Sequence, residues 1–179
     1  MADIILDEKS FQDVVAKISK EIFENNQNIC EVAIVGIQNK GVFLAKRILS
    51  EVSKFAGVDE SQIPFGTLDI TLHRDDLDDF GSEVPVIRDT IIPFDMSRKN
   101  IILIDDVLYT GRTVRAALNV LMDFGRPKSI QLAVLVDRGF RELPIEAKYI
   151  GIKYQSKEFI RVECKEMDGV DKVVVHCKL

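Results

Sequence analysis

The chain has 179 residues, enough for one domain with a sizeable core and short for two, so we expect a single domain over residues 1–179. With 46% hydrophobic and 30% charged residues, the composition is that of an ordinary globular protein. A net charge of −5 argues against nucleic-acid binding through bulk charge, although it leaves room for a local basic patch.

The N-terminal residues argue against export. Asp3, Asp7 and Glu8 stand where a signal peptide would carry positive charge, and no apolar run approaches the length that spans a membrane. The three cysteines are widely spaced without a CxxC pair, which suits a reducing compartment. We therefore expect a cytoplasmic protein with no membrane partner.

The first half of the chain begins with a helix and a strand. Apolar residues recur with a period near 3.6 between residues 11 and 23, which predicts an amphipathic helix that ends within 25–28. A buried strand over 31–35 then leads into a polar loop, 36–41, and a helix from about residue 42. The N–H groups that open a helix can bind an anion, so this loop is either an anion site or an ordinary strand-to-helix turn. Its candidate ligands are Gln38, Asn39, Lys40 and Gly41.

The middle of the chain contains a further strand and an acidic loop. Residues 65–72 alternate between apolar and polar side chains, which predicts a strand with one face packed. The polar loop 73–82 then carries Arg74, Asp75 and Asp76. Composition alone leaves two possibilities for it, a solvated hairpin tip or a mobile lid.

The most informative stretch is 101–113. Four apolar residues run into Asp105 and Asp106, as in a buried strand that ends at the edge of an active site. A short polar loop and a helical pattern from residue 114 follow, so the loop can hold a phosphate and the carboxylates can accept hydrogen bonds from sugar hydroxyls. The alternative is a plain turn with a solvated aspartate pair. The predicted ligand is a ribose 5-phosphate moiety, and the loop residues are Tyr109, Thr110, Gly111, Arg112 and Thr113.

The remaining strands complete an α/β pattern. A buried strand over 130–136 ends at Asp137, and two short apolar runs around an Asp-Gly pair, 159–162 and 173–175, predict a closing hairpin. Strands that alternate with helices predict a doubly wound, mostly parallel sheet in one α/β domain. Both predicted loops and Asp137 follow strands, so we expect all three at one edge of the sheet.

Residues 105–117, together with 125–139 and 69–77, closely resemble the type I phosphoribosyltransferases, which use phosphoribosyl pyrophosphate (PRPP). The resemblance is strongest to the PyrR family, in which pyrimidine-operon attenuation is combined with uracil phosphoribosyltransferase activity. It covers roughly residues 4–151.

The resemblance implies a role for each candidate segment. Loop 38–41 would hold the pyrophosphate of PRPP, and loop 73–82 would be a lid that excludes water. Backbone groups near Val136, Arg138 and Gly139 would bind the base, and Asp137 would hold a water of a Mg²⁺ shell. The resemblance also implies a small hood over the site, PRPP and uracil as substrates, and a homodimer or higher homo-oligomer.

Departures from the family leave other functions open. PyrR sequences commonly have Thr-Arg where this chain has Asn39 and Lys40, and a lysine lacks the bidentate fork of arginine. One alternative is a UMP-responsive regulator that binds the pyr messenger RNA leader. Because Gln12, Asp13 and Asn25 occupy a helix that tends to be basic in RNA-binding members, we expect weak RNA binding. A transferase for a purine base is the third possibility.

Overall fold

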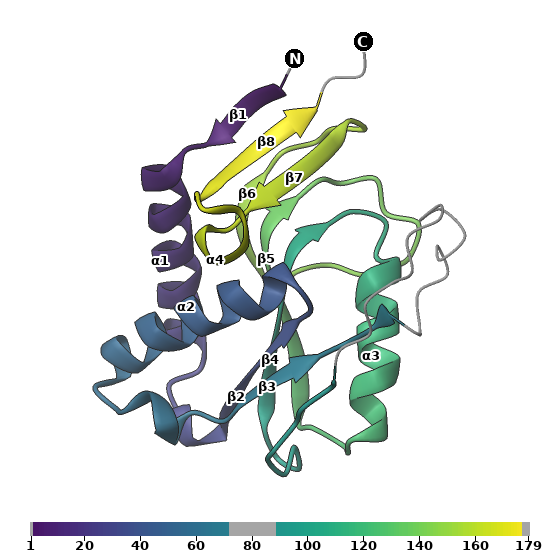
Figure 1. The fold of residues 1–179 in the computed structure, drawn as a ribbon. Helices are drawn as coiled ribbons and strands as arrows, with labels where there is room; N and C mark the ends of the chain where they lie inside the picture. Colours follow the sequence, from purple (N-terminus) through teal and green to yellow (C-terminus); the bar gives the residue numbers. More distant parts are fainter. Residues whose placement is uncertain (1, 72–88, 177–179) are drawn as a thin grey trace.

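A computed structural model describes residues 2–71 and 89–176 of the chain. At its centre is a sheet of five parallel strands in the order β3-β2-β4-β5-β6 (Figure 1). The strands are β2 (Val32–Ile37), β3 (Phe65–Leu68), β4 (Asn100–Leu108), β5 (Ser129–Asp137) and β6 (Tyr149–Lys153). Since neighbouring strands run the same way, their carboxyl ends share one edge of the sheet.

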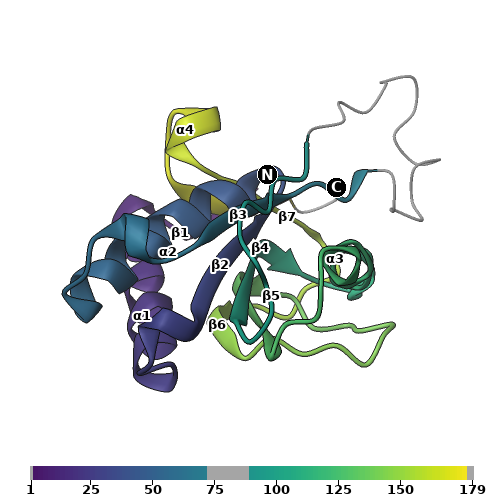
Figure 2. The ribbon, with the colours of Figure 1, turned by 90° about the horizontal axis from the view of Figure 1, so that it is seen from below.

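Helices cover both faces of this sheet (Figure 2). Helices α1 (Glu8–Asn25) and α2 (Lys40–Ala56) pack on one face, and α3 (Arg112–Asp123) packs on the other. In β4, Ile102 and Ile104 belong to the core under α1 and α2, whereas Ile101 and Leu103 belong to the core under α3. This two-sided burial explains the unbroken apolar run at 101–104 and confirms the predicted doubly wound architecture.

Local signals in the sequence set the helix ends. The Asp7 side chain accepts a hydrogen bond from the Ser10 N–H, and the Ser10 hydroxyl oxygen accepts one from the Asp7 N–H, which together form a capping box before α1. Helix α2 ends at Gly57, whose φ of 66° is a left-handed conformation that glycine adopts without penalty. Single-turn 3₁₀ helices, η1 (Ile29–Glu31) and η2 (Glu60–Gln62), precede β2 and β3.

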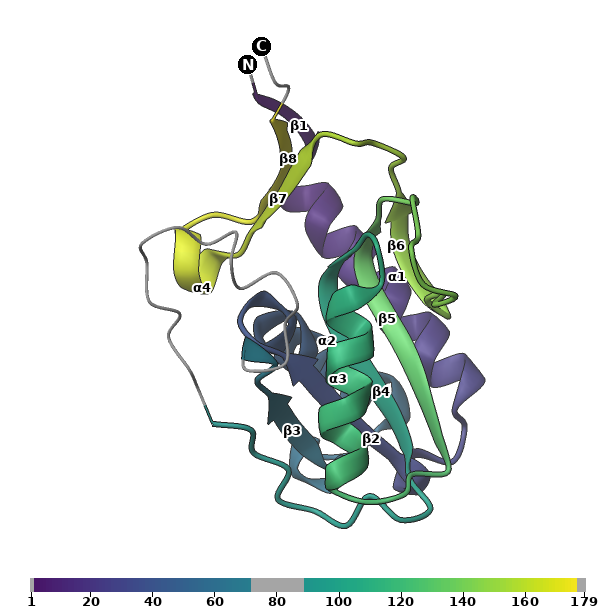
Figure 3. The ribbon, with the colours of Figure 1, turned by 90° about the vertical axis from the view of Figure 1, so that its right-hand side faces the viewer.

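A second, antiparallel sheet lies beyond the carboxyl edge of the first and forms the hood (Figure 3). Its strands are β1 (Ala2–Leu6), β8 (Lys172–His176) and β7 (Phe159–Glu163), in the order β1-β8-β7. The predicted pairing of the last two strands is confirmed, and the connection between them includes a single-turn helix, α4 (Lys165–Asp168). Strand β1, which joins the N-terminus to the hood through β8, is not predicted from the sequence.

Several predicted boundaries are wrong by a few residues. Strand β4 does not end before the two aspartates but continues to Leu108, because its ladder with β5 extends to Asp137. Helix α3 begins at Arg112, two residues earlier than predicted. Strand β2 and helix α2 extend inward and leave only Gln38 and Asn39 between them. Strand β3 ends at Leu68 instead of residue 72.

Two expectations concern other parts of the chain. The expected lid, with Arg74, Asp75 and Asp76, lies outside the described residues. Across 2–71 and 89–176, none of the helices combines the length and apolar character needed to span a membrane.

Candidate active site

Three segments that are far apart in the sequence meet at the carboxyl edge of the parallel sheet. Strand β4 lies between β2 and β5: Ile104 is in register with Gly36 on one side, and Leu108 is in register with Asp137 on the other. The segments that follow these strand ends are therefore neighbours. Loop 38–41, the Asp105–Asp106 pair with residues 109–113, and residues 137–139 come together as the sequence predicted.

The two aspartates are held by backbone hydrogen bonds within β4. The Asp105 carboxylate is buried and accepts a hydrogen bond from the Asp106 N–H at 3.0 Å. Asp106 is partly exposed and accepts one from the Val107 N–H at 2.9 Å. Burial raises the pKa of the Asp106 carboxyl above its ordinary value, while the hydrogen bond from Val107 and the charge of Lys40 act in the opposite direction. Burial therefore makes ionisation of the Asp106 carboxyl costly at this edge of the sheet.

Residues 109–113 form a turn that opens helix α3. Gly111 is the N-cap of this helix and has a φ of 94°, a conformation that residues with a Cβ rarely adopt. Because glycine has no side chain, no side chain caps the first N–H groups of the helix. The Thr110 hydroxyl oxygen accepts a long hydrogen bond, 3.4 Å, from the Arg112 N–H. The exposed Arg112 guanidinium pairs with Glu142 at 2.7 Å, while Thr113 is half-buried in the first turn. A helix N-terminus that begins at a glycine suits the predicted phosphate.

The loop between β2 and α2 is shorter than predicted and packs tightly against β4. The peptide bond between Gln38 and Asn39 is cis, and the Gln38 N–H donates to the Leu68 carbonyl at 2.8 Å. A Cβ on Gly41 would lie 2.5 Å from the Ile104 carbonyl oxygen and 3.2 Å from the Asp105 Cα. Gly41 therefore lets the start of α2 touch the strand one residue before the aspartate pair.

Lys40 extends from this loop toward the hood. Its ammonium donates to the Val162 carbonyl and lies 3.3 Å from the Asp168 carboxylate on α4. The family resemblance predicts Lys40 at the pyrophosphate, but no feature of the sequence assigns a role in the site to Asp168. The Asp168-Gly169 pair is typical of a turn, and that is how the sequence is interpreted. No local signal in the sequence links residues 40 and 168.

Arg138 fixes the third segment to the turn at 109–113. This side chain is 7% exposed, and its guanidinium carbon lies 3.9 Å from the centre of the Tyr109 ring. It also donates to the backbone carbonyls of Ser156 and Glu158. Arg138 therefore holds the base-side loop in place as a cation–π partner and a hydrogen-bond donor.

Asp137 and Gly139 have structural partners at this edge. The Asp137 carboxylate accepts hydrogen bonds from the Arg141 guanidinium at 2.6 Å and from the Gly139 N–H at 2.9 Å. Gly139 has a φ of 71°, and Val136 is fully buried just before the turn. Arg141 is not among the site residues predicted from the sequence, yet it also donates to the backbone carbonyls of Tyr109 and Gly139 and so ties this loop to the phosphate turn.

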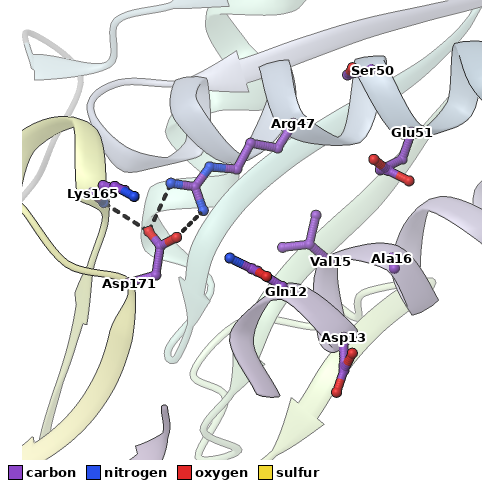
Figure 4. A pocket seen from close by; sticks show the side chains of 9 residues that line it. All are labelled: Gln12, Asp13, Val15, Ala16, Arg47, Ser50, Glu51, Lys165 and Asp171. Atoms are coloured by element: carbon purple, nitrogen blue, oxygen red, sulfur yellow. Dashed lines mark hydrogen bonds and ion pairs between the residues drawn. The ribbon is translucent and has the colours of Figure 1, made fainter. Parts of the chain in front are cut away.

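A separate pocket of about 550 Å³ lies between α1, α2 and the hood (Figure 4). None of the predicted site residues lines it. The lining residues are Gln12, Asp13, Val15, Ala16, Arg47, Ser50, Glu51, Lys165 and Asp171.

Comparisons with known proteins identify the family of this chain. The family model described as "Phosphoribosyl transferase domain" matches residues 1–166. A curated "Bifunctional protein PyrR" from Endomicrobium trichonymphae is 80% identical over 173 residues, which cover 97% of this chain and 98% of that protein. The protein of the same name from Deinococcus deserti is 50% identical and covers 94% of this chain and 91% of its own length.

Solved structures support the fold. A hypoxanthine-guanine phosphoribosyltransferase from Bacillus anthracis superposes with a TM-score of 0.74 at 17% identity and covers 98% of each chain. The hypoxanthine phosphoribosyltransferase of Trypanosoma cruzi gives a TM-score of 0.71 at 14% identity, covering 97% of this chain and 95% of that one. The family match and the high identity to the PyrR proteins place this chain in the phosphoribosyltransferase family, as a member of its PyrR branch.

Proposed function

We propose that this chain transfers the 5-phosphoribosyl group of PRPP to uracil, giving UMP and pyrophosphate. The observation that carries the proposal is the meeting of three segments at the ends of β2, β4 and β5, each suited to one part of these substrates. Membership of the PyrR branch supports uracil over a purine as the base. The purine transferases among the solved structures share the fold at 14–21% identity, which carries no information on the base.

The reaction needs positioning and electrostatic stabilisation and no covalent nucleophile. N1 of uracil forms a bond to C1′ of the ribose as the bond from C1′ to the pyrophosphate oxygen breaks, and uracil loses its N1 proton. Positive charge that develops on the ribose is favoured by the carboxylates of Asp105 and Asp106. Negative charge on the leaving pyrophosphate is met by the Lys40 ammonium and the N–H groups of residues 39–41.

Each substrate group has a proposed place. The 5′-phosphate lies on the N–H groups of residues 110–113 at the start of α3, and the ribose hydroxyls lie on Asp105 and Asp106. Uracil lies beside the backbone of residues 136–139, where Arg138 and Arg141 fix the loop and are not free to leave it. Tyr109 stacks on Arg138 and connects the phosphate turn to the base loop.

The donor set fits Mg²⁺ that arrives with PRPP. Within residues 2–71 and 89–176, no group of three or more acidic, histidine or cysteine side chains could enclose a metal ion. Mg²⁺ in sites of this kind is held by one or two carboxylates together with substrate phosphates and water, which Asp105 and Asp106 allow. When bound, it would neutralise charge on the pyrophosphate. Asp137, paired with Arg141, would act only through a water molecule.

The test is turnover with defined bases. Purified protein is supplied with PRPP, Mg²⁺ and either uracil, hypoxanthine or orotate, and nucleotide formation is followed chromatographically. We expect UMP formation with uracil at a kcat/KM at least about a hundredfold above that with the other two bases, since a site that hydrogen-bonds one base leaves buried groups unpaired with another. Preferential formation of a purine nucleotide would contradict the proposal.

RNA binding is the second proposed property, and we expect it to be weak. Two of the three lysines on helix α1 are partly neutralised: Lys17 and Lys20 lie 3.9 Å and 3.8 Å from Glu21 and Glu24. Lys17 also donates to the Ile150 and Gly151 carbonyls. When a basic protein face binds RNA it releases counterions, so the affinity depends steeply on salt concentration. The paired lysines of this helix face do not favour such binding.

A filter-binding titration checks this expectation with the chain's own pyr leader and a scrambled RNA, at several salt concentrations, with and without UMP. The slope of log affinity against log salt should be shallower than about −2, the value for two to three neutralised phosphates, and the leader should gain nothing from UMP. Nanomolar binding of the leader that tightens with UMP would make regulation a primary function. We further propose that the chain works in the cytoplasm as a homodimer or higher homo-oligomer, as its family resemblance implies.

A further inference from the structure

The hood is fastened to helix α2 by two separate ionic contacts. Lys40 and Arg47 lie seven residues apart on α2, about two turns, and so project from the same side of the helix. The hood segment 164–171 faces them with three carboxylates. These are Glu166, Asp168 and Asp171.

Arg47 makes the structural contact. Its guanidinium donates to both Asp171 oxygens at 2.8 Å and 2.9 Å, and to both Glu166 oxygens at 2.6 Å and 2.9 Å (Figure 4 shows the Asp171 pair). The Asp171 side chain is 4% exposed and also accepts the Lys165 N–H. This bidentate arrangement holds the hood against α2 without any involvement of Lys40.

The second contact reaches the proposed pyrophosphate loop. The Lys40 ammonium lies 3.3 Å from Asp168 Oδ2, and both side chains are largely buried, at 20% and 14% exposure. Asp168 is itself fixed, because it accepts hydrogen bonds from the Cys164 N–H at 2.9 Å and from Arg161 at 3.3 Å. Burial opposes ionisation of Asp168, yet the Cys164 hydrogen bond and the Lys40 charge outweigh it, and the pKa falls below its ordinary value.

Lys40 also acts toward the opposite side of the site. Its positive charge favours the ionised Asp106 carboxyl, whose pKa burial nevertheless keeps above its ordinary value. A lysine side chain has four rotatable bonds, and it keeps a charge at one position only when a partner restrains it. Asp168 and the Val162 carbonyl are the partners that the structure supplies.

We propose that Asp168 is a positioning residue that holds the Lys40 ammonium at the pyrophosphate loop and thereby sets the affinity for pyrophosphate and for the pyrophosphate end of PRPP. The inference rests on the proposed function, because it takes loop 38–41 as the place of the leaving group. The hood then contributes to the reaction through one carboxylate on a four-residue helix.

The test compares Asp168→Asn with Glu166→Gln, a matched control on the same short helix whose carboxylate bonds Arg47 instead of Lys40. The first readout is the affinity for Mg²⁺-pyrophosphate, measured by calorimetry. The second is steady-state kinetics, which separate a change in the KM for PRPP from a change in kcat. We expect Asp168→Asn to weaken pyrophosphate binding and raise the KM for PRPP, each about tenfold, the size expected for one charge-assisted hydrogen bond. Glu166→Gln should leave both constants within about twofold of wild type, a change below about 0.4 kcal/mol.

Combining the Asp168 and Lys40 substitutions distinguishes a positioning role of Asp168 from a general effect of its substitution on the hood. Lys40→Met should weaken pyrophosphate binding about as much as Asp168→Asn does, and the double variant should be no weaker than Lys40→Met alone, because both changes remove one interaction. Asp168→Glu should recover part of the affinity. Wild-type pyrophosphate affinity in Asp168→Asn, tighter binding in that variant, or additive effects in the double variant would each overturn the inference.

The outcome does not depend on turnover. Wild-type protein that binds pyrophosphate but forms no UMP would contradict the proposed function, and the calorimetric comparison of variants would still decide the role of Asp168. Thermal melts of all variants check that the hood remains folded, since Arg47 and its two carboxylate partners are retained in Asp168→Asn.

Discussion

Replacing Asp105 or Asp106 by asparagine is expected to lower the rate of UMP formation about ten- to a hundredfold. Asparagine keeps the shape of the side chain and an acceptor oxygen for the backbone N–H groups that now bond to these carboxylates. It removes the negative charge that accepts ribose hydroxyls and stabilises a cationic ribose. Hydrogen bonds to charged groups contribute about 1.5–3 kcal/mol, which corresponds to the stated loss.

Steady-state kinetics with uracil and PRPP measure this effect. The same substitution at Asp123, an exposed residue at the end of α3, serves as the control and should leave kcat/KM unchanged. Wild-type kinetics in both site variants would move the ribose away from the aspartate pair.

The same Asp106→Asn change should stabilise the free protein at neutral pH. The folded-state pKa of Asp106 is raised by burial above the ordinary 3.8, so the fold favours the protonated carboxyl. Ionisation therefore costs stability once the pH rises above about 4, and the full cost is present above the folded-state pKa. Thermal melts of wild type and Asp106→Asn should coincide at pH 3 and separate in favour of the variant at pH 7. A variant that is less stable at pH 7 would show that the charge is compensated in the free protein.

Gly41→Ala is expected to cost both stability and activity. The added methyl group would lie 2.5 Å from the Ile104 carbonyl oxygen, so the start of α2 or the end of β4 must move. Overpacking of this kind costs about 1–3 kcal/mol. The displaced backbone carries Asp105 on one side and loop 38–41 on the other, and a shift near 1 Å at such a site can lower turnover about a hundredfold.

Gly57→Ala is a matched control at the other end of α2. Gly57 has a φ of 66°, and a Cβ added there would meet no described atom within 4 Å, so alanine costs about 1–2 kcal/mol through conformation alone. Denaturation curves should show similar losses of stability for the two variants, while only Gly41→Ala loses turnover. Wild-type kcat/KM in Gly41→Ala would mean that the packing of α2 on β4 does not position the site.

Much of this site could be predicted because its residues follow buried parallel strands. The apolar runs at 32–37, 101–104 and 132–136 are buried on both faces of the sheet, and such strands are recognisable without knowledge of their neighbours. Polar residues directly after such strands must lie at the carboxyl edge. The ends of the strands were less predictable. Asp105 and Asp106 are polar, yet they belong to β4 because this strand pairs with β5 beyond them, up to Asp137.

Contacts between distant segments could not be predicted from the sequence. The pairing of β1 with β8 joins the two ends of the chain, and β1 is too short to give a pattern of its own. The contact of Lys40 with Asp168 depends on how the hood sits over α2, and the stacking of Arg138 on Tyr109 depends on two loops that meet only in the fold. Each of these contacts is specified by tertiary packing, for which single-sequence periodicity carries no signal.

The central claim is that one nucleotide occupies all three segments at the edge of the sheet, and a crystal structure of the chain with UMP tests it most directly. We predict the phosphate on the N–H groups of residues 110–113, the ribose hydroxyls within hydrogen-bond distance of Asp105 and Asp106, and the uracil ring beside residues 136–139. A nucleotide bound instead in the pocket between α1, α2 and the hood, or a ribose turned away from both aspartates, would contradict this claim.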